Sequence, residues 1–317
     1  MNAMLIDIDG QTAAVSDKIF AGFPDRLGRR TAHRRYKMLF GGAVLEESSI
    51  VEDAPLVVAL NVRGAERGER AEHHLGLVSP IDPAWLDTEE HRSVVWDRRE
   101  GAVVERIETR AGPIVIHHRS EPAYDAELLA QHAKVEDLQL SDADRELIAR
   151  IALLARHLPE LNAQPVDLQA LLPQLCEGKR TRKQLGSVNV GDIVRRELDW
   201  KVRSALDTDA PTHLDLPSGS RRRLQYGEQV VLSVRIQQVF GWSETPRIAR
   251  GRVPVVLELL SPASRPVQIT QDLASFWDTT WTEVCKEMRG RYPKHAWPDD
   301  PRQAVATDRP KRRRPSS

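Results

Sequence analysis

The stretch from Ile114 to Leu158, IVIHHRSEPAYDAELLAQHAKVEDLQLSDADRELIARIALLARHL, decides the fold, because its hydrophobic periodicity changes part-way. Ile114–His118 is a short apolar run typical of a β-strand, and from Ala123 the spacing becomes helical. Ser141–Asp144 resembles a capping box at a helix start, and Pro159 ends that helix. Its apolar stripe is Leu147, Ile148, Ile151, Leu154, Ala155 and Leu158. The sequence therefore predicts an α+β protein in which strands precede helices.

Upstream of this switch, residues 21–122 are rich in Gly and Val and contain short apolar runs broken by Gly and Pro. These runs are Leu56–Leu60, Val94–Trp96, Val103–Ile107 and Ile114–His118. Such spacing predicts a small antiparallel β-barrel, with Gly64–Arg70 as a hairpin tip. Residues 1–20 have weak periodicity and are expected to be a loose segment or the remnant of a preceding domain.

Downstream, residues 123–214 are predicted to form a helical subdomain, which continues through Val166–Glu177 and Asp192–Leu206. Residues 215–303 then form a small α+β domain. In it, Val231–Phe240 has helical spacing with Gly241 as its C-terminal stop. Val253–Leu260 and Pro266–Ile269 flank a Pro-containing turn and predict a hairpin.

A last helix is expected to begin at Thr270 and to end near Gly290, with Asp272 in its first turn. Its apolar stripe is Leu273, Phe276, Trp277, Trp281, Val284 and Met288. Trp277 and Trp281 are four residues apart, which favours packing in the core over a base-stacking platform. Residues 304–317 end in RPKRRRPSS and are predicted to be a disordered basic tail.

The composition points to a cytoplasmic protein of two or three domains. The chain has 317 residues, with 46 Lys and Arg against 46 Asp and Glu. No apolar run reaches the length of about 20 residues that a membrane span needs, and Met1–Phe20 lacks the pattern of a signal peptide. The two cysteines, Cys176 and Cys285, are far apart and are expected to be reduced thiols.

The familiar catalytic motifs are absent. The sequence contains no P-loop, no G-x-G-x-x-G, no H-E-x-x-H and no G-x-S-x-G. The pairs His73-His74 and His117-His118 give no metal site unaided, because adjacent residues on a strand point to opposite faces. An independent nuclease or hydrolase therefore has no support.

Charge is clustered although the total is neutral. Phe23–Phe40 holds six basic residues and one acid, and Lys286–Ser317 holds ten basic residues and four acids. Further basic clusters occur at Lys179–Lys183, Arg221–Arg223 and Thr245–Arg252, whereas Glu121–Glu146 has eight acids and two bases. A single cluster is typical of a solvated surface. Several Arg-rich clusters in one neutral chain favour phosphate contacts.

Several segments between 217 and 301 resemble the C-terminal region of HrpB-type bacterial ATP-dependent RNA helicases. They are PSGSR (217–221), FGWSETPRI (240–248), GRVP (251–254), LLSPA (259–263), RPVQITQDLASFW (265–277) and RGRYPKHAWPDDP (289–301). Upstream, AGFPDR (21–26) and IDPAWL (81–86) are similar to the start and end of the OB-type barrel that follows the motor in DEAH-type helicases.

The resemblance implies an accessory part of a helicase. Family members carry two RecA-like motor domains that bind ATP and Mg²⁺, and no matching motif occurs in this sequence. We therefore expect no catalytic residue, no cofactor and no metal in this chain, which alone should be inactive.

The main hypothesis is RNA binding, to single-stranded or structured RNA. The candidate residues are Arg26, Arg29, Arg30, Arg34, Arg35, Arg247, Arg250, Arg252, Arg291, Lys294, His295 and Trp297. The cations would contact phosphates, and His295 and Trp297 could stack on bases. For the RYPKHAWP segment (291–298), packing on the domain with Trp297 as anchor is an equal alternative. Two other possibilities stay open: a module that docks on a separately encoded motor, with Glu121–Glu146 as its partner surface, and a remnant without independent activity.

Overall fold

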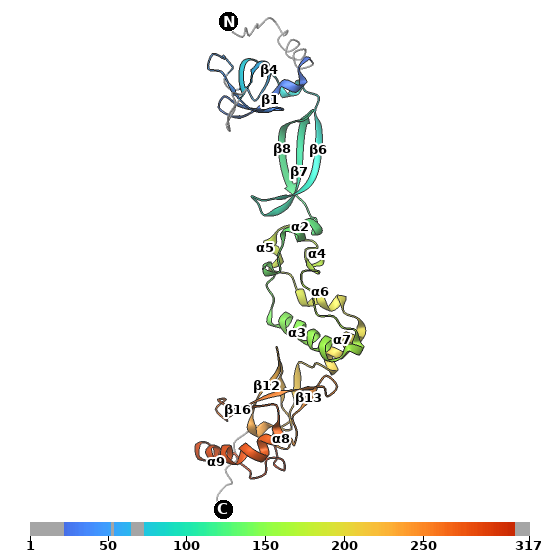
Figure 1. Cartoon of the computed structure of the whole chain (residues 1–317), viewed down its shortest axis with the longest axis vertical. Coiled ribbons are helices and arrows are strands. Elements are labelled where there is room, and N and C mark those ends of the chain that lie inside the picture. Colours follow the sequence, from blue (N-terminus) through green and yellow to red (C-terminus); the bar gives the residue numbers. More distant parts are fainter. Residues whose placement is uncertain (1–21, 52–53, 65–72, 308–317) are drawn as a thin grey trace, which may run out of the picture. The chain divides into compact units, whose positions relative to one another are not determined.

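The computed structural model describes residues 22–51, 54–64 and 73–307, and its contacts divide the chain into two compact units (Figure 1). One unit comprises Met1–His132 with Cys176–Arg182, and the other comprises Ala133–Leu175 with Lys183–Ser317. The predicted segment 1–20, most of the hairpin tip Gly64–Arg70, and residues 308–317 of the predicted tail lie outside the described residues.

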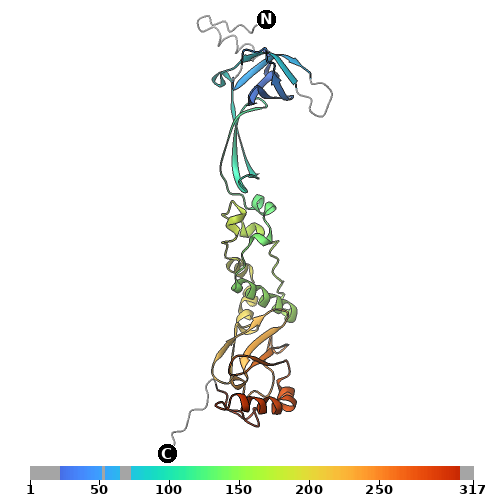
Figure 2. The same ribbon diagram turned by 90° about the vertical axis from the view of Figure 1, so that its left-hand side faces the viewer.

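The described part of the first unit begins with a closed five-stranded barrel (Figures 1 and 2). Its strands are β1 (Leu27–Ala32), β2 (Arg35–Met38), β3 (Gly41–Leu45), β4 (Leu56–Arg63) and β5 (His73–Pro80). They are ordered β1-β2-β3-β5-β4, and β4 closes the barrel on β1. The barrel was predicted to be antiparallel, but β3 and β5 run parallel. Its interior is filled by apolar side chains that include Tyr36, Met38 and Leu75.

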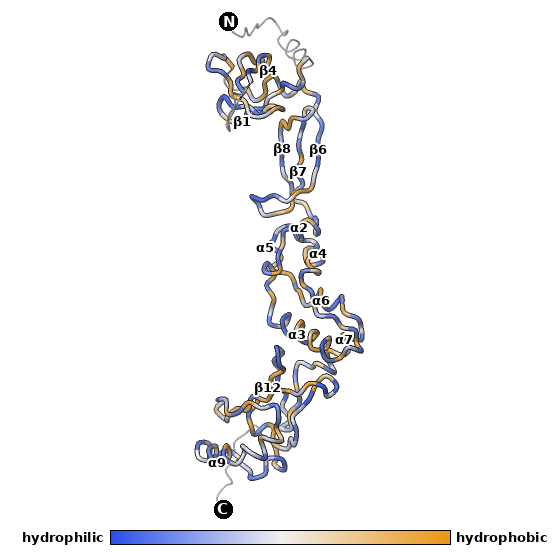
Figure 3. The backbone as a smooth tube through the Cα atoms, viewed as in Figure 1, coloured by the Kyte–Doolittle hydropathy of each residue, from blue (hydrophilic) through white to orange (hydrophobic). Residues whose placement is uncertain are grey.

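The barrel is smaller than the sequence predicted, because three of the expected strands form a sheet of their own. These strands are β6 (Glu89–Asp97), β7 (Ala102–Ala111) and β8 (Ile114–Pro122), in that order. β6 and β8 expose most of their residues, and hydrophilic colours run along much of both strands in Figure 3. A strand with polar residues on both faces has no apolar side to turn into a barrel, which explains the difference.

This sheet contacts the barrel at one end, and ion pairs connect its strands. Ala111 and Ile114 belong to an apolar cluster with Leu27 and Leu56 of the barrel. Across the strands, Arg119 pairs with Glu90 at 3.3 Å and Arg92 pairs with Glu105 at 3.6 Å. Helix α2 (Ala126–His132) follows β8, and the ring of His132 stacks on Trp96 at 4.7 Å between ring centroids.

The second unit begins with short helices around one longer helix. Their bounds are α3 (Asp142–His157), α4 (Leu172–Leu175), α6 (Val190–Glu197) and α7 (Trp200–Thr208), while α5 (Arg182–Leu185) spans the boundary between the units. The capping box at Ser141 is confirmed: its hydroxyl accepts from the Asp144 N–H at 3.1 Å. Two predicted helices were too long. Only Leu172–Leu175 of Val166–Glu177 is helical, and Asp192–Leu206 breaks where Asp199 caps α7.

A four-stranded sheet, ordered β11-β12-β15-β16, forms the centre of the C-terminal part. Its strands are β11 (Gln225–Tyr226), β12 (Val230–Arg235), β15 (Val256–Leu260) and β16 (Pro266–Thr270). Two further sheets have two strands each: β9 (His213–Asp215) pairs with β10 (Arg221–Arg223), and β13 (Arg247–Ile248) pairs with β14 (Val253–Pro254). The predicted hairpin of β15 and β16 is confirmed. The predicted helix Val231–Phe240 is wrong, because β12 pairs in parallel with β15 and only Ile236–Gln238 forms a helical turn.

The last helical stretch covers this sheet in three parts: α8 (Leu273–Ser275), a π-helical turn (Phe276–Thr280) and α9 (Trp281–Arg291). The whole predicted apolar stripe is buried, and Trp277 and Trp281 lie in the core as expected. Asp272, rather than Thr270, caps the helix by accepting from the Ser275 N–H at 2.9 Å. Ala304 and Ala306, predicted to belong to the tail, pack against the core, and the Thr307 N–H donates to Gln237 O at 3.0 Å.

Candidate nucleic-acid interface

The basic cluster of the barrel lies on β1, β2 and the residues beside them. Along β2, Tyr36 and Met38 point into the barrel, so Arg35 and Lys37 point outward. Arg29 on β1 is the register partner of Lys37, which places it on the same outer face. Among the described residues, neither Arg29 nor Lys37 has an acidic partner. The strand pairing thus brings Arg29, Arg35 and Lys37 together.

Lys37 is a candidate that the sequence reasoning missed. It lies within the basic segment Phe23–Phe40 but was not selected. The alternation of charged and apolar residues in Arg35–Met38, RYKM, would have indicated it, since side chains two apart on a strand share a face.

Three other barrel candidates have local roles. The Arg26 guanidinium lies 4.9 Å from the centre of the Phe23 ring and donates to Leu60 O at 3.0 Å. Arg34 has a left-handed backbone, with φ of 52°, and donates to the carbonyls of Leu45 and Glu46. Arg30 is the register partner of the buried Tyr36, which places it on the inward side of β1. Arg26 and Arg34 therefore bind main-chain carbonyls of the barrel itself.

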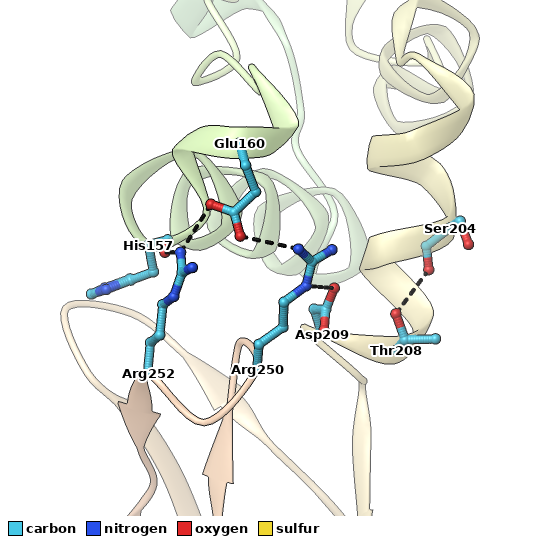
Figure 4. Close-up of polar contacts among 7 residues, drawn as sticks. All are labelled: His157, Glu160, Ser204, Thr208, Asp209, Arg250 and Arg252. Carbon is cyan, nitrogen blue, oxygen red and sulfur yellow. Dashed lines mark hydrogen bonds and ion pairs between the residues drawn. The ribbon is translucent and has the colours of Figure 1, made fainter.

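Arg250 and Arg252, at the turn between β13 and β14, converge on a single carboxylate (Figure 4). Arg250 Nη1 lies 3.0 Å from Glu160 Oε1, and Arg252 Nη1 lies 2.9 Å from Glu160 Oε2. The Arg252 hydrogen bond and its charge, with that of Arg250, hold the pKa of Glu160 below its usual value. Arg247 donates to the carbonyls of Gly251 and Arg252 within its own hairpin. All three candidates thus have partners inside this unit.

The RYPKHAWP segment divides into exposed cations and a buried anchor. Arg291 is exposed and pairs with Glu287 at 2.9 Å, whereas the exposed Lys294 has no ion-pair partner in the described part of the chain. Trp297 is only 6% exposed, and its Nε1 donates to Tyr292 O at 2.9 Å. Trp297 therefore lies where the packing alternative expects it, in the core of the domain. Stacking on a base would require this side chain to leave the core.

His295 is partly buried, between the exposed Lys294 and the buried Trp297. Burial, with the nearby charge of Arg235, holds the pKa of His295 below its usual value. Its Nδ1 is shielded from solvent and has no hydrogen-bond partner among the described residues. A neutral imidazole is suited to ring contacts, and its ring already lies against Tyr292 at 6.4 Å between centroids.

A pocket of about 540 Å³ opens in the helical part beside Glu160. The residues that line it include the apolar Leu161, Val194 and Val202 and the acidic Glu197 and Asp199. No group of His, Cys, Asp and Glu in the described ranges is arranged to hold a metal ion, and no helix there is long and apolar enough to cross a membrane. Cys176 and Cys285 are both buried, and burial raises the pKa of the Cys285 thiol.

Comparison with known proteins agrees with the residues that carried the resemblance. A family model described as "ATP-dependent helicase C-terminal" matches residues 171–301. Over 96% of its length, the chain is 32% identical to the ATP-dependent RNA helicase HrpB of Escherichia coli strain K12, of which it spans 40%. The chain is homologous to the C-terminal region of HrpB-type helicases. The crystal structure of the E. coli DExH-box NTPase HrpB matches with a TM-score of 0.56 and 30% identity, covering 95% of this chain and 40% of that one.

The matches cover both the C-terminal segments and the barrel, from which motifs were quoted above. The family model begins at residue 171, upstream of the first C-terminal segment at 217, and the match to E. coli HrpB includes the barrel as well. The similarity therefore covers nearly all of this chain but only 40% of the length of E. coli HrpB.

Proposed function

We propose that this chain binds RNA as the non-catalytic accessory region of an HrpB-type helicase, through the outer face of an OB-type barrel. The observation that carries the proposal is the pairing of Arg29 with Lys37 on adjacent strands. Like charges directly opposite one another destabilise a sheet, and an anionic ligand lying across both removes that penalty. A basic groove that follows a phosphate backbone is the usual way in which such barrels bind single strands.

The rest of the proposal follows from the homology and from the charge of the surface. Arg35 extends the barrel face, and the exposed Arg291 and Lys294 are candidate contacts in the second unit. ATP and Mg²⁺ would be bound by the motor domains of the family and not by this chain, and the protein would act in the cytoplasm.

The first test is RNA binding by the variant Arg29→Gln/Lys37→Gln. Fluorescence anisotropy of labelled oligouridine should show affinity about tenfold lower than wild type, with the salt slope reduced by about 1.4, because two phosphate contacts of about 0.7 each are lost. Both side chains point away from the barrel core, so the melting temperature should not fall.

The matched control is Arg98→Gln/Arg99→Gln, which removes two exposed cations from the turn after β6. This variant should bind RNA as the wild type does. Equal losses in both variants, or no loss in the first, would reject the barrel face as the binding surface.

Docking on a separately encoded motor is the alternative. The acidic stretch Glu121–Glu146 would be the docking surface, and exposed apolar surface near Met1–Phe20, which lies outside the described residues, would favour this alternative. Limited proteolysis of this chain, alone and mixed with an HrpB-type motor, tests it: protected cleavage sites would favour docking, and an identical pattern would contradict it.

A further inference from the structure

The two arginines around Glu160 are arranged as a site for an oxyanion (Figure 4). Each guanidinium holds a different oxygen of the same carboxylate, at 3.0 Å and 2.9 Å. Arg250 and Arg252 nevertheless keep 46% and 48% of their side-chain surface exposed, so a dissolved anion can reach them. Two guanidinium groups aimed at neighbouring oxygens suit a phosphate as well as a carboxylate.

The turn, and not Glu160, fixes the spacing of the pair. Ala249, Arg250 and Gly251 all have left-handed backbones, with φ of 51°, 55° and 79°. The Ala249 N–H donates to Asp209 O at 2.7 Å, and this alanine is completely buried. Such a turn persists only when its surroundings hold it. The arginines therefore start from a fixed backbone whatever anion lies between them.

Each arginine also has a second partner that does not depend on Glu160. Arg250 Nε lies 3.2 Å from Asp209 Oδ2, and Arg252 Nη1 donates to His157 O at 2.6 Å. Loss of the Glu160 contact would leave both side chains tethered. Glu160 itself is 39% exposed and lines the pocket of about 540 Å³, so its side chain has open space to turn into.

We propose that Arg250 and Arg252 form a latent phosphate-binding site that Glu160 fills in the free protein, and that a phosphate of bound RNA displaces this carboxylate. The identity of the ligand rests on the proposed function. Exchange of one anion for another preserves the ion pairs of both arginines, so the step needs no unfolding of the β13–β14 turn.

The test is the variant Glu160→Gln, which is isosteric and removes the internal anion. One oxygen becomes an NH₂ group facing a guanidinium, so one arginine is released. Anisotropy of labelled oligouridine should show affinity about three- to tenfold higher than wild type, with a salt slope steeper by about 0.7 to 1.4, for one or two additional phosphates. Adding Arg250→Gln/Arg252→Gln to this variant should abolish the gain.

The matched control is Glu197→Gln, which removes a carboxylate from the same pocket that has no arginine partner among the described residues. A gain in Glu160→Gln alone supports the latent site. Unchanged affinity in Glu160→Gln, or an equal gain in Glu197→Gln, overturns it. If Glu160→Gln has a lowered melting temperature, Glu160→Asp replaces it, since this shorter carboxylate cannot bridge both arginines and should show a smaller gain.

Inorganic tripolyphosphate separates failure of this site from failure of RNA binding. It should raise the melting temperature of Glu160→Gln but not that of the triple variant with Arg250→Gln/Arg252→Gln. Stabilisation by tripolyphosphate without RNA binding would leave the phosphate site standing and reject the proposed function. RNA binding that is identical in wild type and Glu160→Gln, with no tripolyphosphate effect, would reject the site alone.

Discussion

Asp144 shows how a single carboxylate joins two helices of the second unit. Its Oδ2 accepts from the N–H and the hydroxyl of Ser141, at 2.9 Å and 2.7 Å, and its Oδ1 accepts from the Gly191 N–H of α6 at 2.8 Å. Burial disfavours the charged form, but the hydrogen bonds from Ser141 and Gly191 outweigh it and lower the pKa of Asp144. The capping box could be read from the sequence. The contact with Gly191, 47 residues away, could not, because it depends on tertiary packing.

Asp144→Asn should lower the free energy of unfolding by about 1–2 kcal/mol near neutral pH. In asparagine an NH₂ group replaces one of the two carboxylate oxygens. This group would face either the two donors of Ser141 or the N–H of Gly191, so at least one hydrogen bond would be lost. Because the pKa of Asp144 is lowered on folding, its contribution is complete above an unfolded pKa of about 4 and is lost as the pH falls through the folded value. Urea denaturation of both proteins should therefore give a difference that shrinks in acid; a difference independent of pH would contradict this role.

Among the elements, hydrophobic periodicity predicted the type correctly where one face of a helix packs on the core. It failed where a helical pattern and an alternating strand pattern occur in the same residues. The stripe of the last helix was predicted completely, although the π-helical turn inside it was not. In Val231–Phe240, Leu232, Val234 and Ile236 also alternate, and all three are buried. The parallel pairing of β12 with β15 decides for a strand, and such pairing is not visible in a local pattern.

Trp297 ties the segment after α9 to that helix, so Trp297→Ala should destabilise the second unit by about 3–5 kcal/mol. Its ring lies 6.3 Å from that of Trp281, and Arg289 donates to its carbonyl at 2.7 Å through Nη2. Thermal denaturation measures the loss. The control is Trp200→Ala, at a position 69% exposed, which should change stability by about 0.5 kcal/mol or less. A neutral Trp297→Ala would show that this ring is not an anchor.

For the whole molecule, the α+β class and the order of barrel, helices and C-terminal part were correctly predicted, because each follows from local spacing. The candidate site was harder. A cluster of arginines in the sequence does not reveal its acids, and the partner of Arg252 lies 92 positions away. Arg29 and Arg250 look alike in the sequence; only the fold shows that the second is already engaged by Glu160 and Asp209.

The two compact units have separate cores, so they should respond separately to core mutations. Leu75→Ala removes a buried side chain from the barrel, and Leu232→Ala removes one from the C-terminal core. Each should cost about 2–5 kcal/mol and shift one calorimetric transition while leaving the other in place. A single transition that moves with both mutations would show that the units unfold together.

The sheet of β6, β7 and β8 constrains how this part of the sequence can diverge. On β6 and β8, where most residues are exposed, many single substitutions remove little buried surface and are tolerated easily, whereas the central strand β7 is half buried. Opposite charges also face one another on adjacent strands, as in the register pair of Glu89 on β6 with Arg110 on β7. A change of sign on one strand is best accommodated by the reverse change on its partner. The exposed positions of β6 and β8 can therefore vary in identity as long as oppositely charged partners change together.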